Sequence, residues 1–201
     1  MKYIFEDFNI EFRKNNIMLS APHCYPQFRN GEIKKKETRT GILVKDLARK
    51  LSLSCIYKTK FYNNDPNWDD NSTYREQLVD FISIHNIKLL IDVHSMRAER
   101  DVDICIGIND GKNILNRFDI ADEIKYVFKS YGFKKVYIDT PFKAAFPNVI
   151  SCYISRMCQI PCFQIEINNK FLHKDYDTYN FDLAKSAFSE IIKKIDLMLL
   201  W

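Results

Sequence analysis

The sequence has 201 residues, of which 46% are hydrophobic and 28% charged, and its formal net charge is +4. These values are typical of a soluble globular protein and argue against disorder or low sequence complexity. Because the net charge is small and no long basic stripe is present, we expect no nucleic-acid partner. The three consecutive lysines at 34–36 are interpreted as part of a solvated loop.

The cysteines and the hydropathy pattern indicate the cellular compartment. Six cysteines are scattered along the chain without a Cys-x-x-Cys pair, which favours reduced thiols in a cytosolic protein over a disulfide framework. Residues 1–14 carry charges throughout and lack the apolar core of a signal peptide, and the longest apolar runs are too short to span a bilayer. We therefore expect a cytoplasmic protein without membrane association, with a single domain over 1–201.

Short apolar runs alternate with amphipathic segments along the chain. The runs predict strands at 17–20, 55–57, 88–92, 103–106, 135–138 and 161–167. The amphipathic segments predict helices at 40–51, 73–85, 119–131, 149–158 and 178–200. Thr73 with Glu76 is the expected capping box of the helix at 73–85, and Gly132 is the expected left-handed cap after the helix at 119–131. The alternation predicts an α/β fold, a three-layer αβα sandwich with a mixed, largely parallel sheet of the phosphorylase/hydrolase-like type.

Two of these strands run into a histidine. In the run at 89–95, Asp92 and His94 are two residues apart and so lie on the same face of the strand. The apolar run at 16–22 ends in a Pro-His step at His23. Since ligands bind at the carboxyl ends of strands in open α/β sheets, two strand-end histidines among only four in the chain indicate a metal site.

A catalytic zinc ion takes three protein ligands and keeps one position open. We choose Glu37 as the third ligand, because it is an acid after the loop from His23 and is expected to open the helix that follows. Glu166 is the one acid in the apolar strand at 162–168, where an unpaired carboxylate is costly, and it is the candidate general base. Asp92 is the expected outer partner that orients His94. The long irregular stretch at 60–71 is expected to be functional.

These residues resemble the N-formylglutamate amidohydrolases, relatives of zinc carboxypeptidases and of aspartoacylase-type deacylases. The matching segments, in chain order, are 20–23, 37–40, 90–95, 103–107, 141–146 and 164–167. The resemblance implies one Zn²⁺ held by His23, Glu37 and His94, with Glu166 as catalytic acid/base. It also implies hydrolysis of an amide bond in a small N-acyl amino acid or short peptide that carries a carboxylate.

One segment departs from the family pattern. The family has an Asp-x-Asn-Arg segment whose arginine helps to bind a substrate carboxylate, whereas residues 65–68 here end in Trp68. We expect formylglutamate to be a poor substrate and Trp68 to contact an apolar part of the preferred one. The cations that could replace the arginine are Arg75, Arg97, Arg100, Arg156 and Lys143. Arg156 is preferred, because a guanidinium within an apolar helix needs an anionic partner.

Plainer interpretations stand beside these. His23 could cap a turn, His94 could be a core histidine, and Glu37 could be a first-turn helix acid. Glu166 could be the ion-pair partner of Arg156 or Lys143, Arg97 and Arg100 could be solvated, and Trp68 could be a hydrophobic plug. Two other functions remain open: a thiol hydrolase that uses Cys24 with His94 as base, and a binding protein that kept the fold without the chemistry.

Overall fold

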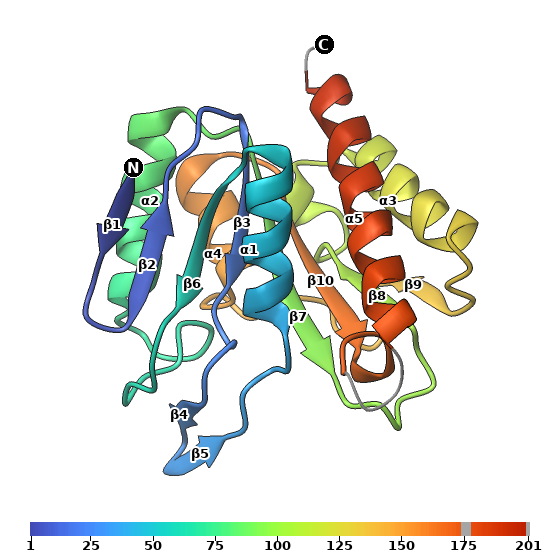
Figure 1. The fold of residues 1–201 in the computed structure, drawn as a ribbon. Coiled ribbons are helices and arrows are strands. Elements are labelled where there is room, and N and C mark those ends of the chain that lie inside the picture. Colours follow the sequence, from blue (N-terminus) through green and yellow to red (C-terminus); the bar gives the residue numbers. More distant parts are fainter. Residues whose placement is uncertain (174–177, 200–201) are drawn as a thin grey trace.

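The computed structural model describes residues 1–173 and 178–199, and its centre is an eight-stranded sheet (Figure 1). The strand order is β1-β2-β6-β3-β7-β10-β8-β9. The strands of this sheet are Lys2–Ile4 (β1), Phe8–Glu11 (β2), Ile17–Ala21 (β3), Ser54–Lys58 (β6), Leu89–Met96 (β7), Ile104–Gly107 (β8), Val136–Ile138 (β9) and Cys162–Asn168 (β10). A separate hairpin pairs Gln27–Arg29 (β4) with Glu32–Lys34 (β5).

The middle of the sheet is parallel and its flanks are mixed. β6, β3, β7 and β10 run parallel to one another. The pairs β1–β2, β2–β6 and β10–β8 are antiparallel, and β8 is parallel to β9. β3 and β10 are buried along their whole length, as expected for parallel strands that are covered on both faces. This arrangement confirms the predicted mixed, largely parallel sheet.

Helices cover both faces of the sheet (Figure 1). Thr40–Leu51 (α1), Phe118–Ser130 (α3) and Thr178–Met198 (α5) contribute to one apolar core. Thr73–His85 (α2) and Ile150–Cys158 (α4) contribute to a second core. Lys112–Ile114 (η1) and Asn169–Phe171 (η2) are short 3₁₀ helices. The protein is therefore a three-layer αβα sandwich, as the alternating pattern predicts.

The helix ends differ in detail from the expectations. The side chain of Ser72, not Thr73, caps α2 and accepts a hydrogen bond from the backbone N–H of Arg75 at 3.4 Å. The expected Thr73–Glu76 capping box is therefore wrong. Gly132 follows α3 with φ +92°, which confirms its left-handed role. The expected end of the last helix at residue 200 lies outside the described residues.

Four short strands were not expected from the sequence. β1, β2 and the β4–β5 hairpin have only three or four residues each, and β7 continues past Asp92 to Met96. Runs this short carry too little periodicity to be distinguished from loops.

Within the part of the chain that the structure describes, no helix is long and apolar enough to cross a membrane.

Candidate metal centre and active site

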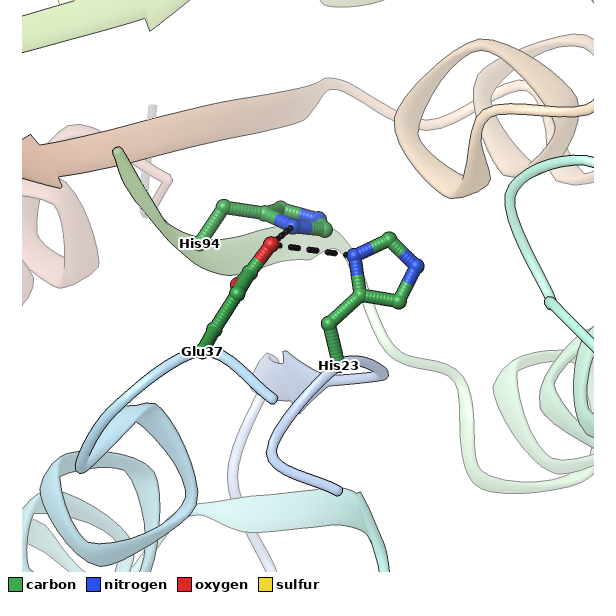
Figure 2. Close-up of side chains that lie close together, drawn as sticks. All are labelled: His23, Glu37 and His94. Atoms are coloured by element: carbon green, nitrogen blue, oxygen red, sulfur yellow. Dashed lines mark hydrogen bonds and ion pairs between the residues drawn. The ribbon is translucent and has the colours of Figure 1, made fainter. Parts of the chain in front are cut away.

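Three segments that are distant in sequence bring His23, Glu37 and His94 together (Figure 2). His94 is on β7, His23 follows β3, and Glu37 lies between β5 and α1. Each residue offers one ligand atom, and these atoms all lie within 4.8 Å of one another. Oε1 of Glu37 is 3.0 Å from Nδ1 of His23 and 3.0 Å from Nδ1 of His94. The structure thus brings together the three residues expected from the sequence.

The parallel pairing of β3 with β7 places the two histidines side by side. Ser20 is paired with Asp92 at the end of this ladder, so the chain leaves β3 next to the carboxyl end of β7. The rings of His23 and His94 lie 4.9 Å apart, centroid to centroid. Strand-end histidines on neighbouring parallel strands therefore converge, as the sequence indicates.

Glu37 reaches the site from the irregular segment between β5 and α1 and not from a helix. α1 begins at Thr40, after Arg39 with φ +60°, so the expectation that Glu37 opens the helix is wrong. Instead, the backbone N–H of Glu37 donates to the carbonyl of His23 at 2.8 Å, and the backbone N–H of Ser95 donates to Oε2 at 3.0 Å. The carboxylate is thus oriented by the strand ends themselves, and the helix-dipole interpretation does not apply.

Each histidine is oriented by an acid on its far side. Nε2 of His94 lies 2.8 Å from Oδ2 of Asp92, and Nε2 of His23 lies 2.9 Å from Oδ1 of Asp65. Both acids are fully buried. Because Nε2 is engaged in both rings, Nδ1 is the nitrogen that faces Glu37. A carboxylate on the distal ring nitrogen is the usual outer partner of a metal-ligating histidine.

These contacts shift the pKa values of all three residues away from their usual ranges. Burial opposes a charge on His23, but the carboxylates of Glu37 and Asp65 outweigh it and raise the pKa of His23 to about 9. Burial likewise opposes a charge on His94, yet Glu37 and Asp92 raise its pKa well above the usual value. Burial acts to raise the pKa of Glu37, and the two imidazoles lower it to about 2. The cluster is therefore built to hold positive charge.

The residues fit a divalent cation. Glu37, Asp65 and Asp92 bring three carboxylates to two imidazoles, and Oδ1 of Asp92 has no hydrogen-bond partner among the described residues. Among the described residues, the arginine or lysine that pairs with this group is Arg29, whose Nε donates to Oδ2 of Asp65 at 2.7 Å. When both imidazoles are neutral, the single positive charge of Arg29 does not balance the three negative charges of the carboxylates. A set of two nitrogens and one carboxylate oxygen is the type that catalytic zinc takes.

Glu166 lies beside this cluster on β10. Its register partner on β7 is His94, so the two side chains share one face of the sheet. Burial raises the pKa of Glu166 to about 7, and its Oε1 accepts a hydrogen bond from Nε2 of Gln164 at 3.1 Å. Among the described residues, no lysine or arginine lies within 4.0 Å of this carboxylate. The interpretation as an ion-pair partner of Arg156 or Lys143 is therefore wrong.

A cavity of about 390 Å³ joins these groups. Its lining includes His23, Glu37, His94 and Glu166, together with an aromatic wall on its rim. In this wall Trp68 stacks on Phe146 with ring centroids 5.1 Å apart. Trp68 is 37% exposed, so it lines the cavity and does not plug it. This placement agrees with the expectation that the 60–71 stretch serves the site.

Arg29 and Asp65 are the site residues that sequence reasoning missed. The guanidinium of Arg29 lies 5.1 Å from the centroid of the Trp68 ring and lines the same cavity. Arg29 comes from β4, a strand that the sequence did not predict. Asp65 belongs to the Asp-x-Asn segment that was matched to the family, and this was the one signal that could have found it.

The other predicted cations lie elsewhere. Arg156 is exposed in the last turn of α4, 5.7 Å from the Tyr153 ring, so the expectation of a buried guanidinium is wrong. Lys143 is exposed and pairs with Asp110 at 2.6 Å. Neither residue lines the cavity. Arg97 and Arg100 line a neighbouring groove.

Cys24 is poorly placed for the thiol chemistry considered above. Its Sγ donates to the carbonyl of Lys58 at 3.2 Å, and burial raises the pKa of the thiol to about 12. Cys24 also does not line the cavity that holds His94. A thiol with so high a pKa is a weak nucleophile at neutral pH, which argues against a Cys24-dependent hydrolase.

Solved structures of several hydrolases share this fold. An N-formylglutamate amidohydrolase from Ralstonia eutropha JMP134 has a TM-score of 0.69 at 12% identity, over 96% of this chain and 97% of that one. A bacteriophage poly-γ-glutamate hydrolase has a TM-score of 0.63 at 16% identity, over 96% and 91%. A Pseudomonas aeruginosa metallo-carboxypeptidase has a TM-score of 0.62 at 12% identity, over 96% of this chain and 60% of that one. At these identities the likeness concerns the fold.

The family comparison is more specific than the structural one. No curated protein sequence matches this chain. The family model for N-formylglutamate amidohydrolase matches residues 73–173, half of the chain. The matched region contains Asp92, His94 and Glu166, whereas His23, Glu37 and Asp65 precede it in the sequence. The chain belongs to the N-formylglutamate amidohydrolase family.

Proposed function

We propose that this protein is a zinc-dependent hydrolase that cleaves an amide bond in a small N-acyl amino acid or a short peptide. The observation that carries the proposal is the convergence of His23, Glu37 and His94 with Glu166 in one cavity. His23, Glu37 and His94 would hold the zinc ion. When bound, Zn²⁺ lowers the pKa of a coordinated water to about 7 and polarises a carbonyl oxygen.

Glu166 has the position and environment of a general base. It lies on the same sheet face as His94, and burial gives it a raised pKa that suits proton transfer near neutral pH. Glu166 takes a proton from the water whose oxygen attacks the amide carbon. It then delivers that proton to the amide nitrogen as the C–N bond breaks, so the products are a carboxylic acid and an amine.

Arg29 takes the place of Arg156 as the cation proposed to bind the substrate carboxylate. Its guanidinium lines the cavity, and Nε and Nη2 are both directed at Asp65, at 2.7 and 2.6 Å. This ion pair holds the guanidinium in one orientation and leaves its remaining N–H groups for a carboxylate. Trp68 and Phe146 beside it would receive an apolar group, so formylglutamate remains a predicted poor substrate.

The solved proteins of the same fold support this reaction class. Their names include a poly-γ-glutamate hydrolase and a metallo-carboxypeptidase, and both names denote cleavage of amide bonds between amino-acid units. We propose the same class of bond for this chain.

Activity of the zinc-loaded protein tests the proposal. A panel of N-acyl amino acids and short peptides would be assayed with the wild type, with Glu166→Gln and with the control Glu123→Gln on α3. Loss of a general base typically costs about 10²–10⁴-fold in turnover, so Glu166→Gln should keep its zinc and lose activity by that factor. Near-wild-type turnover of Glu166→Gln would show that Glu166 is not the general base and has only a structural role. Stoichiometric zinc without hydrolysis of any compound would instead favour a binding protein.

A further inference from the structure

A second, larger groove opens from the metal site. It has a volume of about 1140 Å³, against about 390 Å³ for the cavity around the histidines. Lys34, Glu37 and Ser95 line both spaces. A molecule bound at the site can therefore continue into the groove without leaving the protein surface. The catalytic chemistry proposed above does not use this space.

The two walls of the groove are basic. Lys34, Lys35 and Lys36 come from the end of β5 and the segment after it, and Arg97 and Arg100 come from the loop after β7. Within residues 1–173 and 178–199, the acids in the lining are Glu37, which is engaged by the histidines, and Glu99. Five cations of these described ranges thus face two acids in a chain whose total net charge is only +4.

Most of these cations are available to a ligand. Lys35, Lys36 and Arg97 are exposed, and within residues 1–173 and 178–199 none of the three lies within 4.0 Å of a carboxylate of another described residue. Lys34 is already paired with Glu32 at 2.6 Å, and the guanidinium of Arg100 lies 4.9 Å from the centroid of the Phe142 ring. Groups of one sign on two facing walls raise the local concentration of ligands of the opposite charge.

We propose that the groove binds the continuation of an extended acidic peptide, a chain of amide-linked residues with several carboxylates, whose scissile bond lies at the metal site. This proposal rests on the proposed function, since an amide-cleaving centre at one end of the groove calls for an amide-linked ligand. The lysine run at 34–36 is then one wall of a binding groove and not an ordinary solvated loop.

Binding without turnover tests the groove separately from the chemistry. The probe is a fluorescently labelled deca-glutamate peptide, and its binding to the zinc-loaded protein is followed by anisotropy. The variant is the triple charge reversal Lys35→Glu, Lys36→Glu and Arg97→Glu. The control is Lys88→Glu with Lys193→Glu, and both lysines are exposed. Lys88 precedes β7 at the end opposite His94. Lys193 is near the C-terminal end of α5, and that end of the helix is far from the β4–β5 hairpin (Figure 1).

We expect the triple variant to bind deca-glutamate at least about tenfold more weakly than the control, with wild-type affinity falling as salt rises. Hydrolysis of a short N-acyl amino acid with an uncharged side chain, whose single carboxylate is bound at Arg29, should stay within about twofold in the triple variant. Equal peptide binding by the triple variant and the control would overturn the proposal that the groove binds an acidic peptide. Equal or tighter binding of a labelled ten-nucleotide oligothymidylate would show a general anion surface and would also overturn it. Peptide binding without hydrolysis of any substrate would count against the proposed function alone.

Discussion

At the scale of single residues, an acid on the far side of each imidazole fixes which ring nitrogen faces Glu37. Asp92 and Asp65 engage Nε2 of the two rings and leave Nδ1 toward Glu37. Each acid also compensates charge in a buried site, since both are fully buried. The affinity of the site for zinc should therefore depend on residues that do not bind the ion.

Substitution of these two acids tests that dependence. We expect Asp92→Asn and Asp65→Asn each to weaken zinc binding by about 10–100-fold, the usual cost of losing such an outer partner. Affinity would be measured by competition with a chromogenic chelator, with the exposed Asp122→Asn as control. Unchanged affinity in both variants would mean that the histidines are held by packing alone.

The residues of the site differ in how far the sequence predicts them. His23, Asp92, His94 and Glu166 follow from strand ends and from the two-residue period of a strand, which are local features. Arg29 could not be found this way, because its place depends on a short hairpin packing against a distant loop. Arg156 was misplaced for a related reason. An apolar neighbourhood in sequence does not show which side of a helix faces the core, and Arg156 faces solvent.

At the scale of elements, the loop between β6 and α2 contributes more to the site than its irregular sequence suggests. It carries Asp65 and Trp68. Its backbone carbonyls accept hydrogen bonds from Arg75, whose side chain is almost fully buried. The guanidinium of Arg75 donates to the carbonyls of Asp69 at 2.5 Å, Asp70 at 2.9 Å and Asn148 at 2.7 Å. One side chain thus fastens the loop to the segment before α4.

Removal of this guanidinium should loosen the loop. We expect Arg75→Met to lower the free energy of unfolding by roughly 1.5–3 kcal/mol, because charged hydrogen bonds to partly buried carbonyls are lost. Urea unfolding would measure the change, with the exposed Arg49→Met on α1 as control. The variant should also bind zinc more weakly, since Asp65 loses its support. A stability equal to that of the control would contradict the role assigned to Arg75.

Elements with a clear amphipathic period were predicted well, and short ones were not. The helices at 40–51 and 73–85 match α1 and α2 in both bounds. Glu37 was nevertheless assigned to the wrong element, because the chain makes a left-handed turn at Arg39 before α1 begins. The edge strand β1 was missed because it has three half-buried or exposed residues and shows no hydrophobic alternation.

At the scale of the whole molecule, the strand order builds the site. β3, β7 and β10 are consecutive in the sheet and parallel, so their carboxyl ends meet at one edge. His23, His94 and Glu166 come from these three ends. The alternating sequence pattern predicts such a sheet but not its strand order, which depends on how the helices cross between strands. The proposed chemistry depends on the convergence of side chains at this edge.

Metal content tests that claim most directly. Wild type, His94→Gln and the control His85→Gln, a histidine at the end of α2, would be purified from zinc-supplemented medium and analysed by plasma emission spectroscopy. We predict about one zinc ion per chain in the wild type and in His85→Gln, and a loss of most of it in His94→Gln, because three protein ligands are needed for a catalytic zinc site. A zinc-free wild type, or equal zinc in His94→Gln and the wild type, would contradict it.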